Sequence, residues 1–321
     1  MKPSKIDYRG GEALRLATSK IELIAPTGFG PRLLSLRSLA GGPNLLLEFP
    51  PGADDSAGNE GFRLRGGHRF WHSPEHIVRT YQPDNDPLEV RTRASGFSVT
   101  AVTEVKTGLR KTLAVDALDA RTLRLTHTLT NDGLWAVECA PWALTMMKHG
   151  GYGVIPLLPK GDHAAGDLLP GYSIVPWTYT DLSLPCWDLH RNHIGLDSRR
   201  VPSPQKLGLT NYPGWSAYWI GGVTLVKQAF VIPGATYPDL GCPFETFCNQ
   251  TTLELETLGP LRSLAPGEAV THVEHWTVLD GLAKPSTDAA FAALAKAVNA
   301  WLRGQRLAAQ TRALIAGAIR R

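Results

Sequence analysis

The chain has 321 residues, which is enough to bury a substantial core in one large domain or in two ordinary ones. Hydrophobic residues make up 43% of it and charged residues 19%, as in an ordinary soluble globular protein. The formal net charge is only +4, and Lys and Arg are spread through the chain, with no basic run longer than short pairs such as Arg199-Arg200. Because nucleic-acid binding favours a continuous basic stripe, this distribution argues against such a partner.

Motifs for export, membrane insertion and cofactor binding are missing. The N-terminal residues lack the apolar core of a signal peptide, and no run approaches the ~18 consecutive apolar residues of a membrane helix. We therefore expect a cytoplasmic protein that binds no membrane. Gly28-Phe29-Gly30-Pro31 is only a fragment of a dinucleotide-binding motif, and we expect no cofactor. The four cysteines have no paired metal-type spacing and are expected to be buried thiols: Cys139, Cys186, Cys242 and Cys248.

The first half of the chain has the pattern of short β-strands. Between residues 21 and 48, brief apolar runs alternate with Gly and Pro, and residues 50–62 form a polar segment typical of an exposed loop. The strand pattern continues from Val90. Its clearest case is Arg121–Thr130, where the alternate positions are Leu123, Leu125, His127 and Leu129 until Asn131-Asp132-Gly133 ends the pattern. This alternation predicts a half-buried antiparallel strand that runs into a tight turn.

The middle of the chain, residues 159–213, is different in kind. It is rich in Pro, Gly, Asp, Trp and His and shows little periodicity. Long irregular segments inside a compact domain often form binding sites or lids. A polar cluster from Asp188 to His193, with Asp197, lies here and is interpreted mainly as solvated loop. Strands are expected to resume from Trp215 and to continue to Leu279.

The stretch from Thr251 to Trp276 is predicted to form two strands joined by a turn. In its first half, Glu254 and Glu256 alternate with leucine and therefore share one face of a strand. Two carboxylates on one face can be a solvated outer surface or can line a cleft. Gly259-Pro260 and Pro266-Gly267 supply the breaks.

Only the C-terminal tail is predicted to be helical. Ser286 or Thr287 can cap a helix whose larger apolar residues recur at helical spacing, and Leu307–Ile319 is a possible second helical piece. No linker divides the chain. We expect an all-β domain over residues 1–282 and a helical appendage over residues 283–321 that packs on the same domain.

The most concentrated chemistry lies in residues 66–76, GGHRFWHSPEH. Aromatic faces stack on sugar rings while Arg, His and Glu hydrogen-bond hydroxyl groups, so this composition suits a carbohydrate site. Two alternatives stay open: a structural loop, and a metal site that uses His68, His72 and Glu75. Elsewhere, Glu138 must be exposed or belong to a polar site, because a buried carboxylate needs a partner.

Three motifs in their order resemble galactose mutarotase-like proteins. They are GPRLLSLRSLAGGPNLLLE at residues 30–48, the strand that ends at Asn131-Asp132-Gly133, and LELETLGPLRSLAPGEAVTHVEHWTV at residues 253–278. GGHRFWHSPE at residues 66–75 is most similar to an uncharacterised branch of that superfamily. The resemblance extends to about Leu279. It implies a large antiparallel β-supersandwich with a cleft of sugar size on its concave face.

The resemblance also implies a chemistry. In aldose 1-epimerases of this fold, a glutamate removes the proton of the anomeric hydroxyl and a histidine protonates the ring oxygen. By position, Glu256 matches the base. The usual acid histidine is replaced by Ala140-Pro141-Trp142-Ala143. His72 or His68 is then the candidate acid, and Arg69 can take the place of the family's arginine.

These expectations define the predicted site and function. Glu256, His72 and His68 are the predicted catalytic residues. The predicted substrate contacts are Arg69, Trp71, Glu75, Trp142, Glu245 and Glu254. The function expected is that of a sugar-binding protein, either an aldose 1-epimerase-like enzyme or a related carbohydrate-active enzyme that uses a glutamate as general base. The alternatives are a non-catalytic carbohydrate-binding or regulatory module and, less favoured, a metal-dependent lyase or hydrolase. The sugar and the oligomeric state stay open.

Overall fold

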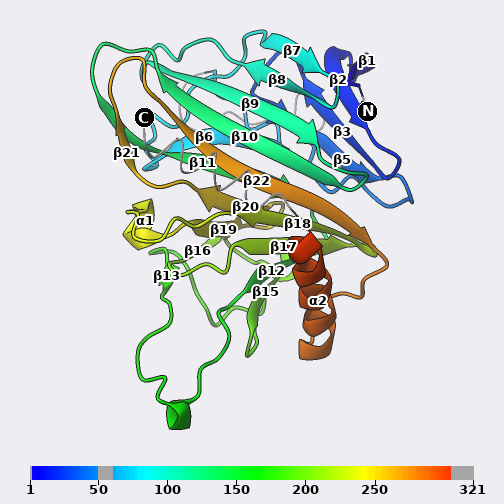
Figure 1. The fold of residues 1–321 in the computed structure, drawn as a ribbon, viewed down its shortest axis with the longest axis vertical. Helices are drawn as coiled ribbons and strands as arrows, with labels where there is room; N and C mark the ends of the chain where they lie inside the picture. Colours follow the sequence, from blue (N-terminus) through cyan, green and yellow to red (C-terminus); the bar gives the residue numbers. More distant parts are fainter. Residues whose placement is uncertain (1, 50–60, 305–321) are drawn as a thin grey trace.

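A computed structural model describes residues 2–49 and 61–304. It is dominated by antiparallel β-sheet, with every strand pair between residues in these ranges antiparallel, as the alternating sequence patterns predict. A four-stranded sheet near the N-terminus has the order β1 (Ser4–Tyr8), β2 (Gly11–Ala17), β3 (Ile21–Pro26) and β5 (Ser35–Ser38). The all-β prediction is confirmed, and two larger sheets form the body (Figure 1).

The larger sheet has ten strands. Their order is β14 (Trp187–Leu189), β15 (His193–Asp197), β12 (Tyr152–Pro156), β17 (Trp215–Ile220), β18 (Val223–Ala229), β22 (Ala269–Asp280), β10 (Thr122–Asn131), β9 (Leu109–Ala117), β8 (Gly96–Thr100) and β7 (Glu89–Arg93). The strand predicted over residues 121–130 is therefore β10, at the middle of this sheet.

The sheet that matters for function has eight strands. Its main path is β13 (Ile174–Pro176), β16 (Gln205–Leu209), β19 (Phe244–Cys248), β20 (Leu253–Leu258), β11 (Val137–Met147), β6 (His68–Ser73) and β4 (Arg32–Leu33), and β21 (Arg262–Leu264) pairs with β11 beside it. Short helical turns occur at η1 (His163–Ala165), η2 (Ser198–Arg200) and α1 (Pro238–Gly241).

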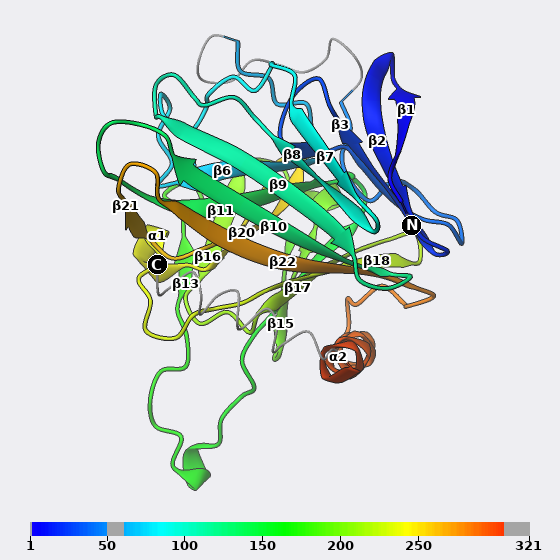
Figure 2. The same cartoon turned by 45° about the horizontal axis from the view of Figure 1, so that its top comes forward.

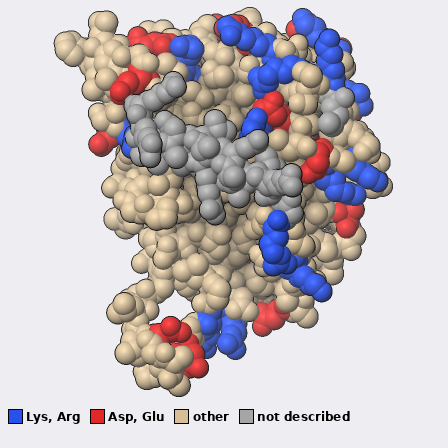
Figure 3. Space-filling model, viewed as in Figure 1, with Lys and Arg blue, Asp and Glu red and all other residues tan. Residues whose placement is uncertain are grey.

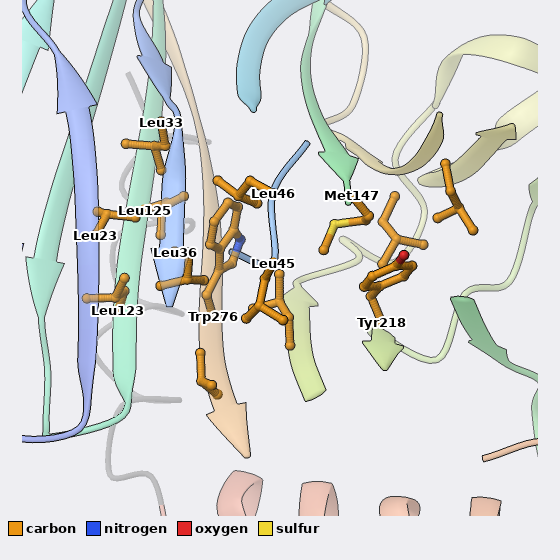
Figure 4. Packing of buried hydrophobic residues seen from close by; sticks show 14 of the residues in the cluster. Leu23, Leu33, Leu36, Leu45, Leu46, Leu123, Leu125, Met147, Tyr218 and Trp276 are labelled. Carbon is orange, nitrogen blue, oxygen red and sulfur yellow. The ribbon is translucent and has the colours of Figure 1, made fainter. Parts of the chain in front are cut away.

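A large hydrophobic cluster fills the space between the sheets. Trp276 of β22 lies among leucines from β3, β4, β5 and β10, and Met147 and Tyr218 continue the packing toward β12 (Figure 4). Each of these side chains is nearly inaccessible to solvent. Burial of apolar area on this scale stabilises the sandwich by about 25 cal/mol for each Å² removed from water.

The predicted hairpin of residues 251–276 is wrong in one respect. β20 and β22 are both strands with the predicted alternation, but they belong to different sheets: β20 pairs with β11 and β19, whereas β22 pairs with β10 and β18. Gly259 turns the chain away from β20 and donates its backbone N–H to Pro141 O at 2.8 Å. The connection therefore crosses from the eight-stranded to the ten-stranded sheet instead of folding back.

The long middle segment contains more strand than its composition predicts. It supplies β13, β14, β15 and β16, which extend both sheets. Residues 159–173 are all exposed and form an arm that projects from the body and carries η1 at its tip (Figures 1 and 2). The root of the arm leads directly into β13, so it borders the eight-stranded sheet.

The tail forms α2 (Asp288–Gly304), which lies against the ten-stranded sheet (Figure 2). Thr287 Oγ1 accepts a hydrogen bond from the Ala290 backbone N–H at 3.3 Å, as expected of a helix cap. Phe291, Leu294 and Val298 are buried against apolar residues of β12, β17 and β18. The predicted second helical piece, Leu307–Ile319, lies outside the described residues.

Charges are mixed on the face seen in Figure 3, where Lys and Arg are interspersed with Asp and Glu. Within residues 2–49 and 61–304, no helix is long and apolar enough to cross a membrane. All four cysteines are buried free thiols, as predicted.

Candidate functional site

The outer face of the eight-stranded sheet carries a continuous row of functional side chains. β20 provides Glu254 and Glu256, and the leucine between them, Leu255, points into the core on the other side. The neighbouring strand β19 places Glu245 directly opposite Glu256. On the other side of β20, Leu144 of β11 lies opposite Glu256. The carboxylate face predicted from the sequence is therefore a cleft floor.

β11 and β6 continue this face with aromatic and basic side chains. Trp142 and Trp71 lie opposite each other in the strand register, and their rings pack edge to face with centroids 5.6 Å apart. Arg69 occupies the same face of β6 as Trp71. Its guanidinium lies over the Trp71 ring, 4.2 Å from the ring centroid. Together these residues form one wall of the cleft.

An ammonium group links two of the glutamates. Lys206 of β16 has its Nζ 2.7 Å from Glu245 Oε2 and 3.0 Å from Glu256 Oε2. Trp142 Nε1 donates to the same Glu256 oxygen at 2.9 Å. The other oxygens, Glu256 Oε1 and Glu245 Oε1, have no hydrogen-bond partner among the described residues. Glu256 is thus fixed by one oxygen while the second stays available.

Arg69 holds the third glutamate of the floor. Its Nη1 donates to Glu254 Oε1 at 3.0 Å and its Nη2 donates to Glu254 Oε2 at 3.3 Å. This two-point pairing fixes the orientation of both side chains. Glu254 is 4% exposed and Arg69 is 5% exposed, so the pair is largely shielded from water.

The space above this floor consists of two adjoining cavities of about 390 and 290 Å³. Both are lined by Glu75, Tyr81, Trp142 and Lys206. Tyr81 donates its hydroxyl to Glu75 Oε1 at 2.5 Å and so positions that carboxylate at the rim. A volume of this order accommodates a small organic ligand.

Burial sets the protonation of the floor. It raises the pKa of Glu256 and holds the pKa of Glu245 well above its usual range, in both cases against the opposing effect of Lys206. Burial disfavours a charged Lys206, but the adjacent carboxylates of Glu256 and Glu245 outweigh it and hold the Lys206 pKa well above its usual value. The ammonium therefore stays charged, and the two glutamates together retain a proton more readily than free carboxylates do.

His68 and His72 do not reach the cleft, which corrects their predicted role as its acid. Along β6, side chains alternate between the faces of the sheet. Arg69 and Trp71 point to the cleft, and His68 and His72 consequently point to the interior between the two large sheets, where they are almost fully buried.

His68 belongs to a buried polar cluster. Its Nε2 lies 2.8 Å from His127 Nε2, and its Nδ1 lies 2.9 Å from Thr145 Oγ1. Burial holds the pKa of His68 well below its usual value and lowers that of His127 to about 4, so both rings are neutral near pH 7. Lys227 balances the charge of Glu274 in the same cluster, with Nζ 3.1 Å from Glu274 Oε1. The cluster is a satisfied structural network.

His72 is isolated from that network. Its Nδ1 has no hydrogen-bond partner within the described part of the chain, and burial lowers its pKa to about 3. Because His68 and His72 face the interior while Glu75 is exposed beyond the end of β6, the three residues do not form the metal site considered above.

The predicted substrate contacts fare differently. The cavities bring together all of them: Arg69, Trp71, Glu75, Trp142, Glu245 and Glu254. Glu138, in contrast, is exposed at the start of β11. The cluster from Asp188 to His193 lies on the β14–β15 hairpin and faces α2, where the ring of His193 stacks on Phe291.

Several cleft residues were not predicted. Lys206, Trp177 and Tyr179 come from the segment 159–213, and Asp239 comes from α1. The composition of that segment favours a binding site or a lid, but composition alone does not identify which residues line the site. The signal for Lys206 was its alternation with leucine in Gln205–Leu209, which is a strand pattern.

Comparison with known proteins identifies the fold. No protein-family model and no curated protein sequence matches this chain. A candidate aldose 1-epimerase from Escherichia coli K12 matches in structure with a TM-score of 0.54 and 13% identity, over 83% of this chain and 98% of that one. A galactose mutarotase-like protein from Clostridium acetobutylicum matches with a TM-score of 0.55 and 9% identity, over 87% and 98% of the two chains.

The same architecture also occurs inside a larger protein. A TPR-domain containing protein from Parabacteroides distasonis matches with a TM-score of 0.59 and 14% identity, over 84% of this chain and 48% of that one. This chain therefore has the galactose mutarotase-like fold that its sequence motifs imply, at sequence identities that show the fold alone.

Proposed function

We propose that the cleft binds a monosaccharide-sized sugar and that the protein interconverts the anomers of an aldose. The observation that carries this proposal is the state of Glu256. One of its oxygens is anchored by Trp142 and Lys206, and the other, Oε1, is buried without a partner in the floor of a cavity. A general base needs such a fixed position together with a free lone pair.

The aromatic walls support a sugar as the ligand. Trp71 and Trp142 line the cavity and offer apolar faces for a pyranose ring, while Glu254 and Arg69 offer acceptors and donors for hydroxyl groups. The match to galactose mutarotase-like structures is consistent with this ligand class.

Glu245 is the proposed proton donor in place of a histidine. It faces Glu256 across the β19–β20 register, and burial keeps its pKa well above the usual range, so it holds a proton where an ordinary glutamate has lost it. In the proposed reaction, Glu256 Oε1 takes the proton of the anomeric hydroxyl and Glu245 gives its proton to the ring oxygen. The bond from the anomeric carbon to the ring oxygen breaks, and the resulting open-chain aldehyde closes again by the reverse steps on either face.

Polarimetry on freshly dissolved α-glucose and α-galactose, and on further aldoses, tests this proposal. The wild type should accelerate the approach to the equilibrium rotation. Glu256→Gln should lower the catalysed rate constant ~10²–10⁴-fold while it still binds the sugar. The exposed Glu138→Gln is the matched control and should behave as the wild type. If the wild type and Glu256→Gln both relax at the buffer rate across the panel, the epimerase proposal fails.

A non-catalytic sugar-binding module is the second candidate. It is favoured by the ion pairs that Lys206 makes with both glutamates, since these reduce the basicity of Glu256, and by the position of His68 and His72 outside the cleft. Calorimetry separates the two functions: a sugar that binds to the wild type and to Glu256→Gln without any rate acceleration by either protein supports the module.

A further inference from the structure

Of the two adjoining cavities, the one of about 390 Å³ is called the outer cavity and the one of about 290 Å³ the inner cavity. The outer cavity has an acidic rim and aromatic walls. It is lined by the carboxylates of Glu75, Asp239 and Glu245 and by the rings of Tyr81, Trp142 and Trp177. Lys206 Nζ already lies over the Trp142 and Trp177 rings, 4.7 and 4.8 Å from their centroids, so a ligand cation is attracted mainly by the carboxylates of Glu75 and Asp239. This arrangement goes beyond what a neutral hydroxyl ligand requires.

The cations that line the cleft are already paired. Arg69 is bound at two points to Glu254, and Lys206 lies between Glu245 and Glu256. In the described lining of both cavities, the carboxylates outnumber these two cationic side chains, with Glu75 and Asp239 in excess at the rim. A phosphate or carboxylate on the ligand would therefore be repelled, while a positive charge would be attracted.

Glu245 gives an independent indication of a ligand. Its side chain is 0% exposed and its Oε1 has no hydrogen-bond partner in the described residues, although it lines the outer cavity. An unpaired buried carboxylate oxygen is costly. A ligand atom in the cavity that forms a hydrogen bond with this carboxyl group would remove that cost.

The backbone of the rim is held in an unusual conformation. Asp239 has φ 51° and ψ 56°, and Leu240 has φ 62° and ψ 25°, so two successive residues with side chains adopt the left-handed region. Such conformations cost free energy and are concentrated at ligand sites. Here the strained turn keeps the Asp239 carboxylate at the cavity, with Ser73 Oγ donating to its Oδ2 at 3.4 Å.

We propose that the preferred ligand is a cationic amino sugar whose ammonium group occupies the outer cavity beside the rim carboxylates of Glu75 and Asp239. This inference rests on the proposed sugar site and specifies its substrate class. The ring of the sugar lies over the inner cavity, near Glu254 and Glu256, and the amine supplies donors to Glu75 and Asp239.

Calorimetry with matched ligands tests the inference. Glucosamine and galactosamine, at a pH at which their amines are protonated, are compared with glucose, galactose, N-acetylglucosamine and glucose 6-phosphate. The amino sugars should bind about tenfold more tightly than the neutral sugars, since exposed ion pairs and cation–π contacts each contribute modestly. Glucose 6-phosphate should bind most weakly, and the amine preference should disappear as the pH rises through the pKa of the ligand's amine.

Rim variants provide the second measurement. Glu75→Gln and Asp239→Asn remove one carboxylate each, and Asn tolerates the left-handed conformation that Asp239 adopts. Each should reduce the ratio of amino-sugar to neutral-sugar affinity, and the double variant should bring it close to one. Glu138→Gln removes an exposed carboxylate outside the cleft and should keep the ratio of the wild type.

The outcomes distinguish this inference from the proposed function. Neutral sugars that bind and mutarotate with no preference for the amine, or a preference for glucose 6-phosphate, overturn the cationic substrate and leave the epimerase proposal standing. Amino sugars that bind without being mutarotated support the cation site and contradict the epimerase. Failure of every sugar to bind overturns both.

Discussion

The indole N–H of Trp142 donates a hydrogen bond of 2.9 Å to Oε2 of Glu256, across neighbouring strands of the eight-stranded sheet. Trp142 occupies the position at which the resemblance to aldose 1-epimerases leads one to expect a histidine. In this protein that position orients the candidate base, and the proposed proton donor, Glu245, lies on another strand.

Replacing Trp142 by Phe should impair catalysis more than binding. The ring still forms the wall of the cavity, but Glu256 Oε2 loses one of its two donors. Loss of one hydrogen bond to a charged group is worth about 1.5–3 kcal/mol, which corresponds to a decrease in kcat of roughly tenfold to a hundredfold. Polarimetric kcat and KM measure the effect. Trp219→Phe, which removes an indole donor to Leu282 O far from the cleft, is the control.

Lys206→Met should destabilise the fold strongly near pH 7. The substitution leaves Glu245 and Glu256 buried without their counter-charge, and breaking a buried ion pair from one side costs about 3–5 kcal/mol. The cost should shrink at acidic pH, because protonation removes the uncompensated negative charges. Urea unfolding at several pH values measures this trend. An equal loss at every pH would contradict the ion-pair explanation, and the exposed Lys160→Met should have little effect.

His72→Leu should make the protein less sensitive to acid. Burial lowers the pKa of His72 from 6.5 to about 3, so below pH 6.5 the unfolded state takes up a proton that the folded state does not. Folding stability is therefore lost as the pH falls from 6.5 toward 3, by up to about 1.4 kcal/mol per pH unit for this one group. The variant lacks this loss, and its plot of unfolding free energy against pH should be flatter than that of the wild type or of the exposed His163→Leu.

The same variant separates structure from catalysis. Because His72 faces the interior, His72→Leu should retain mutarotation in the folded protein. A loss of activity without loss of stability would restore His72 as a catalytic candidate.

Phe291→Ala should loosen α2 from the body. The Phe291 ring stacks on His193 with ring centroids 4.2 Å apart and packs near Trp215, and removing a buried aromatic ring costs about 3–5 kcal/mol. Hydrogen exchange should show faster opening of residues 288–304. The exposed Ala292→Ser on the same helix should leave exchange close to that of the wild type, and unchanged exchange in Phe291→Ala would show that the packing contributes little.

Local sequence patterns were sufficient to predict that the fold is all-β and to predict which side chains share one face of a strand. Alternation with leucine placed Glu254 and Glu256 on one face of β20, and the same rule applied to His68–Ser73 separates Arg69 and Trp71 from His68 and His72. The prediction that His68 or His72 is the acid does not use this alternation, because it does not assign residues 66–76 to a strand.

Only the tertiary structure determined whether each face of a strand lies against the core or lines the cleft. Whether a strand face looks into the core or into a cleft depends on the sheet that receives the strand, which is why β20 and β22 separated although their sequence resembles a hairpin. The site itself joins Lys206, Trp142 and Glu256 through strand pairing between segments far apart in the chain. The direction of a side chain follows from the two-residue repeat of its own strand, so the sequence alone determined it. The register and the neighbours of a strand follow from packing between distant segments, so only the folded chain determined them.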